Sequence, residues 1–367
     1  MKINVVTSFF WPVSGDVEDY PYNIARIVKE SKNELEVLTT DVWPDGKKIE
    51  RQNPDEYKGM KIKRFKCFAN LTWFVKLWFP VFENPDIIHC CGGFRHPHFL
   101  ASFLKRKNAK FFISPFFPMH PKQGLLQKLY VKIGDWTINR FIVKRANCCF
   151  AETEMEKKWL ESLGAKKVVI LPNSLSDKAF VKGDKKRFFK KYKIKGKIIF
   201  SLGRHVPIKN FEEIINVLKD IDATLVIGGE TTEYTEKLKL LIKELKLEKK
   251  VIFPGFMDAN AKADAYSACD LFVLSSIRES LGTVVIEAMA QEKPVIATNT
   301  GGLNEVVPDK FCLYEQGNLD ELREKINLFL NDKKFARAIG IKGKKKAIEK
   351  FSFKKMKEKY LGAIKNA

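Results

Sequence analysis

The sequence predicts an α/β protein made of two doubly wound, Rossmann-like domains. Its 367 residues suit two domains of about 150 residues each. Short β-branched runs alternate with longer amphipathic stretches, and this alternation restarts after residue 195. Such a pattern is typical of parallel strands covered by helices. With 45% hydrophobic residues, the chain can bury the two cores that this fold requires.

The first half contains a series of predicted strands with helices between them. The strands are INVVTSF, LEVLTT, DIIHCC, KFFISPF and NCCFAET, and the helices are DYPYNIARIVKES and HPHFLASFLKRK. The strand segments are short and apolar, as expected for strands buried on both faces of a parallel sheet. We expect this domain to span residues 1–175.

The second half repeats the pattern and ends in a basic segment. Its predicted strands are KIIFSLG, TLVIGGE, KVIFPG, DLFVLSS and KPVIATN, with helices such as NFEEIINVLKDI and TVVIEAMAQE between them. A turn-rich and then basic stretch at 171–197 marks the boundary. We therefore expect a second domain at 176–345 and a cleft beside the boundary. A basic helix from about Lys342 to Tyr360 is expected to let the segment 346–367 brace the first domain.

The formal net charge of +22 favours an anionic partner: a phosphate-bearing substrate, nucleic acid or an acidic membrane surface. A Lys-rich bias also arises from genome composition or growth at high temperature, so charge alone does not decide. No nucleic-acid-binding signature is present, and we expect no such partner. The seven cysteines show no zinc-like spacing and are expected to be reduced, and the adjacent pairs Cys90/Cys91 and Cys148/Cys149 are expected to be small core residues. The start MKINVVTSFFWP lacks a signal-peptide pattern and no run of 18 apolar residues occurs, which predicts a cytoplasmic protein.

The strongest indication of function is the segment RESLGTVVIEAMAQEKPVIATNTGGLNEVV, residues 278–307. It places a loop with Gly282, and a helix beginning near Thr283, after the predicted strand DLFVLSS. Ligands of open α/β sheets bind at the carboxyl ends of strands, and free N–H groups at a helix start suit a diphosphate. Glu287, one turn into the helix, is placed to bind a ribose diol, and Glu279 in the loop is placed to bind sugar hydroxyls. Each glutamate alone is better explained as a surface charge, but the combined context favours binding.

A second cationic turn, GRHVPIKNF, follows the predicted strand KIIFSLG. Gly203 and Arg204 end the strand, and Lys209 precedes the next helix. An Arg fork and a Lys ammonium at one turn can neutralise a diphosphate from two directions. In a Lys-rich chain either cation can also be an ordinary surface charge.

The sequence resembles glycosyltransferase family 4, a family of retaining enzymes with the GT-B fold, in which two Rossmann-like domains face each other across a cleft. The similarity runs along nearly the whole chain. It is carried by FFWPVSG, PDIIHCCG, CCFAETEMEKKWLESLGAKKVVILPNS, GRHVPIKNF, YSACDLFVLSS, ESLGTVVIEAMA, KPVIATNTGGLNEVV and EKFSFKKMKEKY. The resemblance implies a hexosyltransferase that moves a sugar from a nucleoside-diphosphate sugar to a glycan or lipid-linked acceptor.

The resemblance also implies roles for individual residues. Arg204 and Lys209 match the family's diphosphate-binding pair, and Glu279 and Glu287 match its two glutamates, the first holding the donor sugar and the second the ribose. Backbone groups of Gly203, Ser280, Leu281, Gly282 and Thr283 would contact the donor, Gly15 would lie in a first-domain loop, and Asn173 matches a Pro-Asn-Gly motif. His120 is the nearest candidate for a family histidine, or else a loop residue between prolines. Asp16 and Ser174 depart from the pattern, since both positions commonly hold glycine. No metal or cofactor is implied.

Other interpretations remain open on the sequence. A glycosidase using Glu279 and Glu287 would leave the cationic turn unexplained, whereas a nucleotide-sugar epimerase, a phosphorylase or a non-catalytic protein that binds anionic polymers or membrane surfaces is compatible with it. The segment IKRFKCFANLTWFVKLWFPVF, residues 62–82, spaces Trp73, Phe74, Leu77 and Trp78 so that they can share a helical face. With lysines nearby, such a helix would dock on an acidic membrane, or else pack on the core of the first domain.

Overall fold

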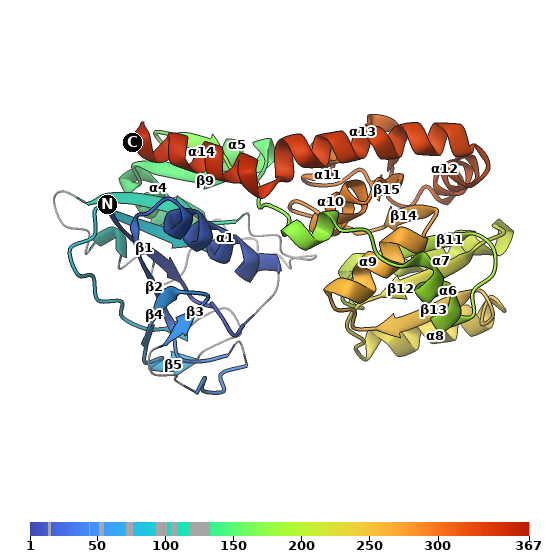
Figure 1. The fold of residues 1–367 in the computed structure, drawn as a ribbon, viewed down its shortest axis with the longest axis horizontal. Helices are drawn as coiled ribbons and strands as arrows, with labels where there is room; N and C mark the ends of the chain where they lie inside the picture. Colours follow the sequence, from blue (N-terminus) through green and yellow to red (C-terminus); the bar gives the residue numbers. More distant parts are fainter. Residues whose placement is uncertain are drawn as a thin grey trace. The chain divides into compact units, whose positions relative to one another are not determined.

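The protein consists of two compact units, shown in Figure 1. A computed structural model describes residues 1–13, 16–43, 45–50, 55–70, 76–92, 98, 101–103, 109–116 and 133–366. Unit 1 contains Met1–Ser174 and Met356–Ala367, and unit 2 contains Leu175–Lys355. Each unit has its own sheet and its own hydrophobic core. The prediction of two Rossmann-like α/β domains is therefore confirmed.

The described part of unit 1 is built on one sheet with the strand order β10-β9-β8-β7-β1-β2-β4-β3. The strands are β1 (Lys2–Thr7), β2 (Glu34–Thr40), β3 (Glu56–Tyr57), β4 (Met60–Phe65), β7 (Ile87–Cys91), β8 (Lys110–Ser114), β9 (Cys148–Ala151) and β10 (Val168–Ile170). They pair in parallel, apart from the antiparallel pair β3 and β4. The strand order reverses between β1 and β7, so unit 1 has the doubly wound topology.

Helices and a small hairpin complete the described part of unit 1. They are α1 (Asp16–Glu30), the π-helical η1 (Asp135–Asn139), α4 (Arg140–Arg145), α5 (Glu154–Ser162), α14 (Phe353–Lys365), and the antiparallel pair β5 (Ala69–Asn70) and β6 (Lys76–Leu77). Thr153 caps α5, because its hydroxyl accepts a hydrogen bond from the backbone N–H of Glu156.

Helix α14 is held in unit 1 by a buried polar network. His89 on β7 lies with its Nδ1 2.9 Å from the Tyr360 hydroxyl and its Nε2 2.9 Å from the Ser114 hydroxyl. The Tyr360 ring also lies against Phe150 of β9, and Figure 1 shows α14, in red, beside β9 and α5. Burial lowers the pKa of His89 to about 3, so the imidazole is neutral and pairs as a hydrogen-bonding group. The last helix of the chain thus completes the first unit.

Unit 2 contains a parallel sheet in the order β13-β12-β11-β14-β15-β16. Its strands are β11 (Ile198–Leu202), β12 (Thr224–Gly228), β13 (Val251–Gly255), β14 (Leu271–Leu274), β15 (Val295–Thr298) and β16 (Leu313–Tyr314). From β11 the chain proceeds to β12 and β13, and then crosses back to β14 on the other side of β11. The topological switch point of this sheet is therefore between β11 and β14, where doubly wound proteins bind their ligands.

The helices of unit 2 cover this sheet. They are η2 (Asp177–Phe180), α6 (Lys185–Tyr192), η3 (Pro207–Lys209), α7 (Phe211–Val217), η4 (Leu218–Asp220), α8 (Tyr234–Glu244), α9 (Ala259–Ala268), α10 (Thr283–Ala290), α11 (Leu303–Val306), η5 (Lys310–Cys312), α12 (Leu319–Asn331) and α13 (Lys333–Phe351). The basic stretch at the predicted boundary forms α6, which buries Phe188 in the unit 2 core and contacts α9 through hydrogen bonds from Arg187 to Asp264.

The predicted amphipathic helix over residues 62–82 is wrong for the described residues. Residues 62–65 belong to β4, and Leu77 belongs to β6. Trp78 is fully buried in the unit 1 core, where its ring stacks with Phe65. Trp73 and Phe74 lie outside the described residues. The period-two alternation of KIKRF, with Ile62 and Arg64 buried, explains why a strand forms here instead of a helix.

The predicted helix from Lys342 to Tyr360 is instead two helices. Helix α13 ends at Phe351, Ser352 has an extended backbone, and α14 begins at Phe353. The prediction that the pairs Cys90/Cys91 and Cys148/Cys149 lie in the core is confirmed, and all seven cysteines are free thiols, of which Cys67 is half-buried. Among the helices of the described residues, none combines the length and hydropathy needed to cross a membrane.

Candidate functional site

The cationic turn predicted from the sequence lies at the switch point of unit 2. Strand β11 ends at Leu202, and the exposed residue Arg204 follows at its carboxyl end. The 3₁₀ turn η3 then brings Lys209 back toward β14, because the backbone N–H of Ile277 donates to the carbonyl of Ile208 at 2.8 Å. The Ser275 hydroxyl donates to the carbonyl of Lys209 at 3.0 Å. These bonds fix the turn against the loop that follows β14.

Lys209 and Glu279 form an ion pair at this point. The Lys209 ammonium contacts Oε1 of Glu279, and the Ser276 hydroxyl donates to the same oxygen at 3.0 Å. The two charged side chains are 23% and 14% exposed, so both are partly removed from water. The fold thus joins two residues that are 70 positions apart in sequence. The site therefore offers a cation for a phosphate group and, directly beside it, a carboxylate that can accept hydrogen bonds from hydroxyl groups of the same ligand.

Gly282 shapes the loop between Glu279 and α10. It has a positive φ of 74° and precedes the first residue of the helix, Thr283. A Cβ added at Gly282 would lie 2.5 Å from Cδ2 of Leu303, a side chain with no exposed surface. The site therefore requires glycine for both conformation and space. Beyond it, the first backbone N–H groups of α10 are available to an anion, as at any helix start.

Glu287 lies in the second turn of α10 and is held by two side chains of α9. Its Oε1 is 2.5 Å from the Lys262 ammonium, and its Oε2 accepts a hydrogen bond of 2.9 Å from the Tyr266 hydroxyl. The three side chains line a cavity of about 40 Å³, which Gln291 also borders. Sequence reasoning missed Lys262 and Tyr266. Their i, i+4 spacing on a predicted helix was the available signal, but only the fold shows that this helix faces α10.

The remaining predicted residues divide between the units. Leu281 is buried, and the hydroxyl of the half-buried Ser280 has no hydrogen-bond partner among the described residues. Asn173 belongs to unit 1, where its side-chain oxygen accepts a hydrogen bond of 2.9 Å from Asn23. Gly15 and His120 lie outside the described residues. Within the described ranges, no group of three or more His, Cys, Asp or Glu side chains is arranged to hold a metal ion.

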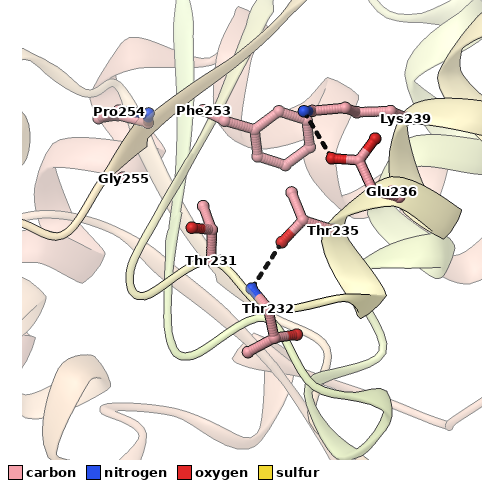
Figure 2. Close-up of a pocket in the computed structure, with 8 residues that line it drawn as sticks. All are labelled: Thr231, Thr232, Thr235, Glu236, Lys239, Phe253, Pro254 and Gly255. Atoms are coloured by element: carbon pink, nitrogen blue, oxygen red, sulfur yellow. Dashed lines mark hydrogen bonds and ion pairs between the residues drawn. The ribbon is translucent and has the colours of Figure 1, made fainter.

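A larger hollow lies elsewhere in unit 2, between α8 and β13, and Figure 2 shows its lining. It measures about 370 Å³ and includes none of the predicted site residues. Several of its polar side chains pair with one another or with the backbone: Thr235 accepts from the backbone N–H of Thr232 at 3.0 Å, and Glu236 pairs with Lys239 at 2.8 Å. The switch point carries the Lys209–Glu279 ion pair, and the small cavity at Glu287 lies on the helix that follows, so we regard these two places together as the functional site.

Comparisons with known proteins connect this site to one family. Residues 184–346, which lie within unit 2, match the family model "Glycosyl transferases group 1". An uncharacterised glycosyltransferase of Methanocaldococcus jannaschii is 26% identical over 363 residues, covering 97% of this chain and 95% of that protein. The GPI3 subunit of phosphatidylinositol N-acetylglucosaminyltransferase of Saccharomyces cerevisiae is 21% identical over 348 residues, covering 90% of this chain and 75% of the subunit.

A solved structure resembles the fold along the whole chain. The HepE protein of Anabaena, crystallised with UDP and glucose, aligns with a TM-score of 0.77 and 18% identity, and the alignment covers all of both chains. At this level of identity the similarity establishes the GT-B fold.

Proposed function

Because the chain belongs to the group 1 glycosyl transferases, we propose that it transfers a hexose from a nucleoside-diphosphate sugar to an acceptor hydroxyl, with retention of the anomeric configuration. The observation that carries the proposal is the convergence at the β11–β14 switch point. There the Lys209–Glu279 ion pair joins the turn that also carries the exposed residue Arg204 to the loop that leads into α10. This arrangement is suited to a ligand with a diphosphate at one end and sugar hydroxyls at the other.

In the proposed reaction, the bond between the anomeric carbon and the β-phosphate oxygen breaks while the acceptor oxygen forms a bond to the same carbon. Charge develops on the departing nucleoside diphosphate, and Lys209, Arg204 and the first N–H groups of α10 stabilise it electrostatically. The acceptor attacks from the leaving-group side and passes its proton to a phosphate oxygen of the donor. Glu279 orients the sugar by accepting hydrogen bonds from its hydroxyls, and no enzyme nucleophile takes part.

Product analysis with UDP-, GDP- and ADP-sugars tests this proposal. We expect release of a nucleoside diphosphate that depends on an acceptor, and a product whose anomeric proton coupling matches that of the donor. Glu279→Gln should lower turnover, and Glu287→Ala should weaken nucleotide binding, because the first is proposed to contact the sugar and the second the ribose. The matched control is Lys239→Met, which removes an ion-paired lysine on the hollow at α8.

The same assay separates the alternatives. An epimerase would convert one nucleotide sugar into another without releasing a nucleoside diphosphate, and a phosphorylase would require inorganic phosphate. A glycosidase would cleave a glycoside in the absence of any nucleotide. Any of these results would overturn the transferase proposal, as would unchanged kinetics in both glutamate variants.

We extend the proposal to an acceptor presented at the cytoplasmic face of a membrane. The yeast relative is named for a phosphatidylinositol substrate. In unit 1, the exposed residues Phe68 and Phe79 lie with ring centroids 5.5 Å apart, and Lys66 lies 6.0 Å from the Phe68 ring. Residues 61–83 contain five basic side chains and one acidic side chain. An exposed aromatic pair with a lysine beside it, in a segment of net positive charge, suits an anionic lipid interface.

Liposome flotation tests this docking surface. The protein should bind vesicles rich in phosphatidylglycerol more strongly than phosphatidylcholine vesicles, and the double variant Phe68→Ser/Phe79→Ser should lose this binding. Leu240→Ser is the control, since Leu240 is an equally exposed apolar residue on unit 2. Equal flotation of the double variant and the wild-type protein would refute the assignment without affecting the donor site.

A further inference from the structure

Tyr266 is a rigid hydrogen-bond donor to Glu287. Its side chain is 2% exposed, and its ring packs edge-on against Phe200 with centroids 5.1 Å apart. The Tyr266 hydroxyl lies 2.9 Å from Oε2 of Glu287 and 3.1 Å from the carbonyl oxygen of Val284. Because a hydroxyl has one proton, it donates to one of these at a time, and the charged carboxylate is the stronger acceptor.

Lys262 holds the other oxygen of the same carboxylate. It lies one helical turn before Tyr266 on α9, and its ammonium is 2.5 Å from Oε1 of Glu287. The Lys262 side chain is 31% exposed and that of Glu287 is 14% exposed. The carboxylate is thus fixed at both oxygens by two donors from one neighbouring helix.

A carboxylate offers about four lone-pair sites, two on each oxygen. In the described structure Lys262 fills one site on Oε1 and Tyr266 fills one on Oε2, which leaves one acceptor site on each oxygen. Two acceptor sites on adjacent oxygens match a vicinal diol, whose two hydroxyls can donate side by side. A single hydroxyl would leave one site of a mostly buried carboxylate unpaired, which is unfavourable.

We infer that Lys262 and Tyr266 are positioning residues that orient Glu287 to accept both hydroxyls of a ribose, and that they thereby select ribonucleoside over 2′-deoxyribonucleoside diphosphates. This rests on the proposed function, because it takes Glu287 as the ribose-binding residue. It adds two residues of α9 to the donor site and gives them a role in substrate discrimination.

Calorimetric titration with matched nucleotide pairs tests the inference. The probes are UDP, GDP and ADP with their 2′-deoxy counterparts. For the preferred base, the wild-type protein should bind the ribonucleotide about ten- to a hundredfold more tightly, as expected for one hydrogen bond to a charged group. Glu287→Gln should remove most of this preference. Lys262→Met and Tyr266→Phe should each reduce it several-fold by weakening the ribonucleotide, with little change for the 2′-deoxy form.

Controls distinguish positioning from a general effect. Lys262→Arg should retain the preference, and Lys239→Met, which removes an ion-paired lysine on α8, should behave as the wild type. Thermal unfolding of Tyr266→Phe establishes that its ring packing is kept. The inference is overturned if Lys262→Met and Tyr266→Phe keep the full preference, or if they weaken both nucleotides equally. If the wild type binds no nucleoside diphosphate at all, the proposed function itself fails, and this inference with it.

Discussion

Replacing Gly282 with alanine tests the turn that precedes α10. The glycine has a φ of 74°, and an alanine there pays a conformational cost of about 1–2 kcal/mol. Its Cβ would also lie 2.5 Å from Cδ2 of the fully buried Leu303, and forcing an extra carbon into a packed site costs about 1–3 kcal/mol. Together these terms predict that Gly282→Ala lowers the free energy of unfolding of unit 2 by about 2–5 kcal/mol.

Gly317→Ala is a matched control for the first term. Gly317 has a φ of 87°, and an added Cβ would meet no atom within 4 Å, so only the conformational cost applies. Urea unfolding of both variants should therefore show a loss of about 1–2 kcal/mol for Gly317→Ala and a larger loss for Gly282→Ala. Adding Leu303→Ala to Gly282→Ala should relieve the clash but create a cavity, so a combined loss smaller than the sum is expected. Equal losses in the two glycine variants would refute the steric reasoning at Gly282.

Three further predictions concern the charged site, the buried histidine and the thiols. Arg204→Ala and Lys209→Ala should each weaken nucleoside-diphosphate binding, measured by calorimetry, by about 1.5–3 kcal/mol without lowering the unfolding temperature. Normal binding in both variants would show that the diphosphate does not bind at this turn. Burial lowers the native pKa of His89 to about 3, so below pH 6.5 the unfolded state binds a proton that the native state does not. Acidification from pH 7 to pH 5 should therefore lower the free energy of unfolding, measured in urea, by about 2 kcal/mol. A His89→Gln variant with the same pH sensitivity as the wild type would contradict this. Burial raises the pKa of Cys148 to about 11 and that of Cys149 to about 12. Titration of the native protein with a thiol reagent at pH 7 should therefore show fast reaction of Cys67 alone, because the other six cysteines are buried. Fast reaction of several thiols would contradict their burial.

The central strands could be predicted from the sequence because both faces of a parallel sheet are buried. The strands β1, β7, β11 and β14 are short and mostly apolar, and the predicted segments agree with them within a few residues. Strand β4 was missed because the segment 62–82 was interpreted as one helix from the spacing of Trp73, Leu77 and Trp78, although its first residues alternate with the period of a strand. The burial of Arg64 depends on Asp55, which accepts a hydrogen bond of 2.6 Å from its Nε. That partnership is tertiary, so the local pattern does not reveal it.

The candidate site was predictable in part, for a related reason. The positions of Arg204, Lys209, Glu279 and Glu287 followed from turns and helix starts after predicted strands, and the family resemblance supplied their order. The contact between Lys209 and Glu279 requires β11 and β14 to be neighbours, which only the strand order shows. The pairing of Glu287 with Lys262 likewise depends on α9 lying against α10. The side chains that could not be predicted, Lys262 and Tyr266, come from α9, a helix that reaches the site only through the tertiary fold.

The return of α14 to unit 1 has a consequence for synthesis on the ribosome. Residues 1–174 leave the ribosome first, but the hydroxyl of Tyr360 that pairs with His89 arrives almost two hundred residues later. Until then the unit lacks a helix of its own core, whereas unit 2 is one continuous stretch, Leu175–Lys355, and is complete as soon as it emerges. The order of folding is thus expected to run against the order of translation, with the first unit to be made being the last to be finished.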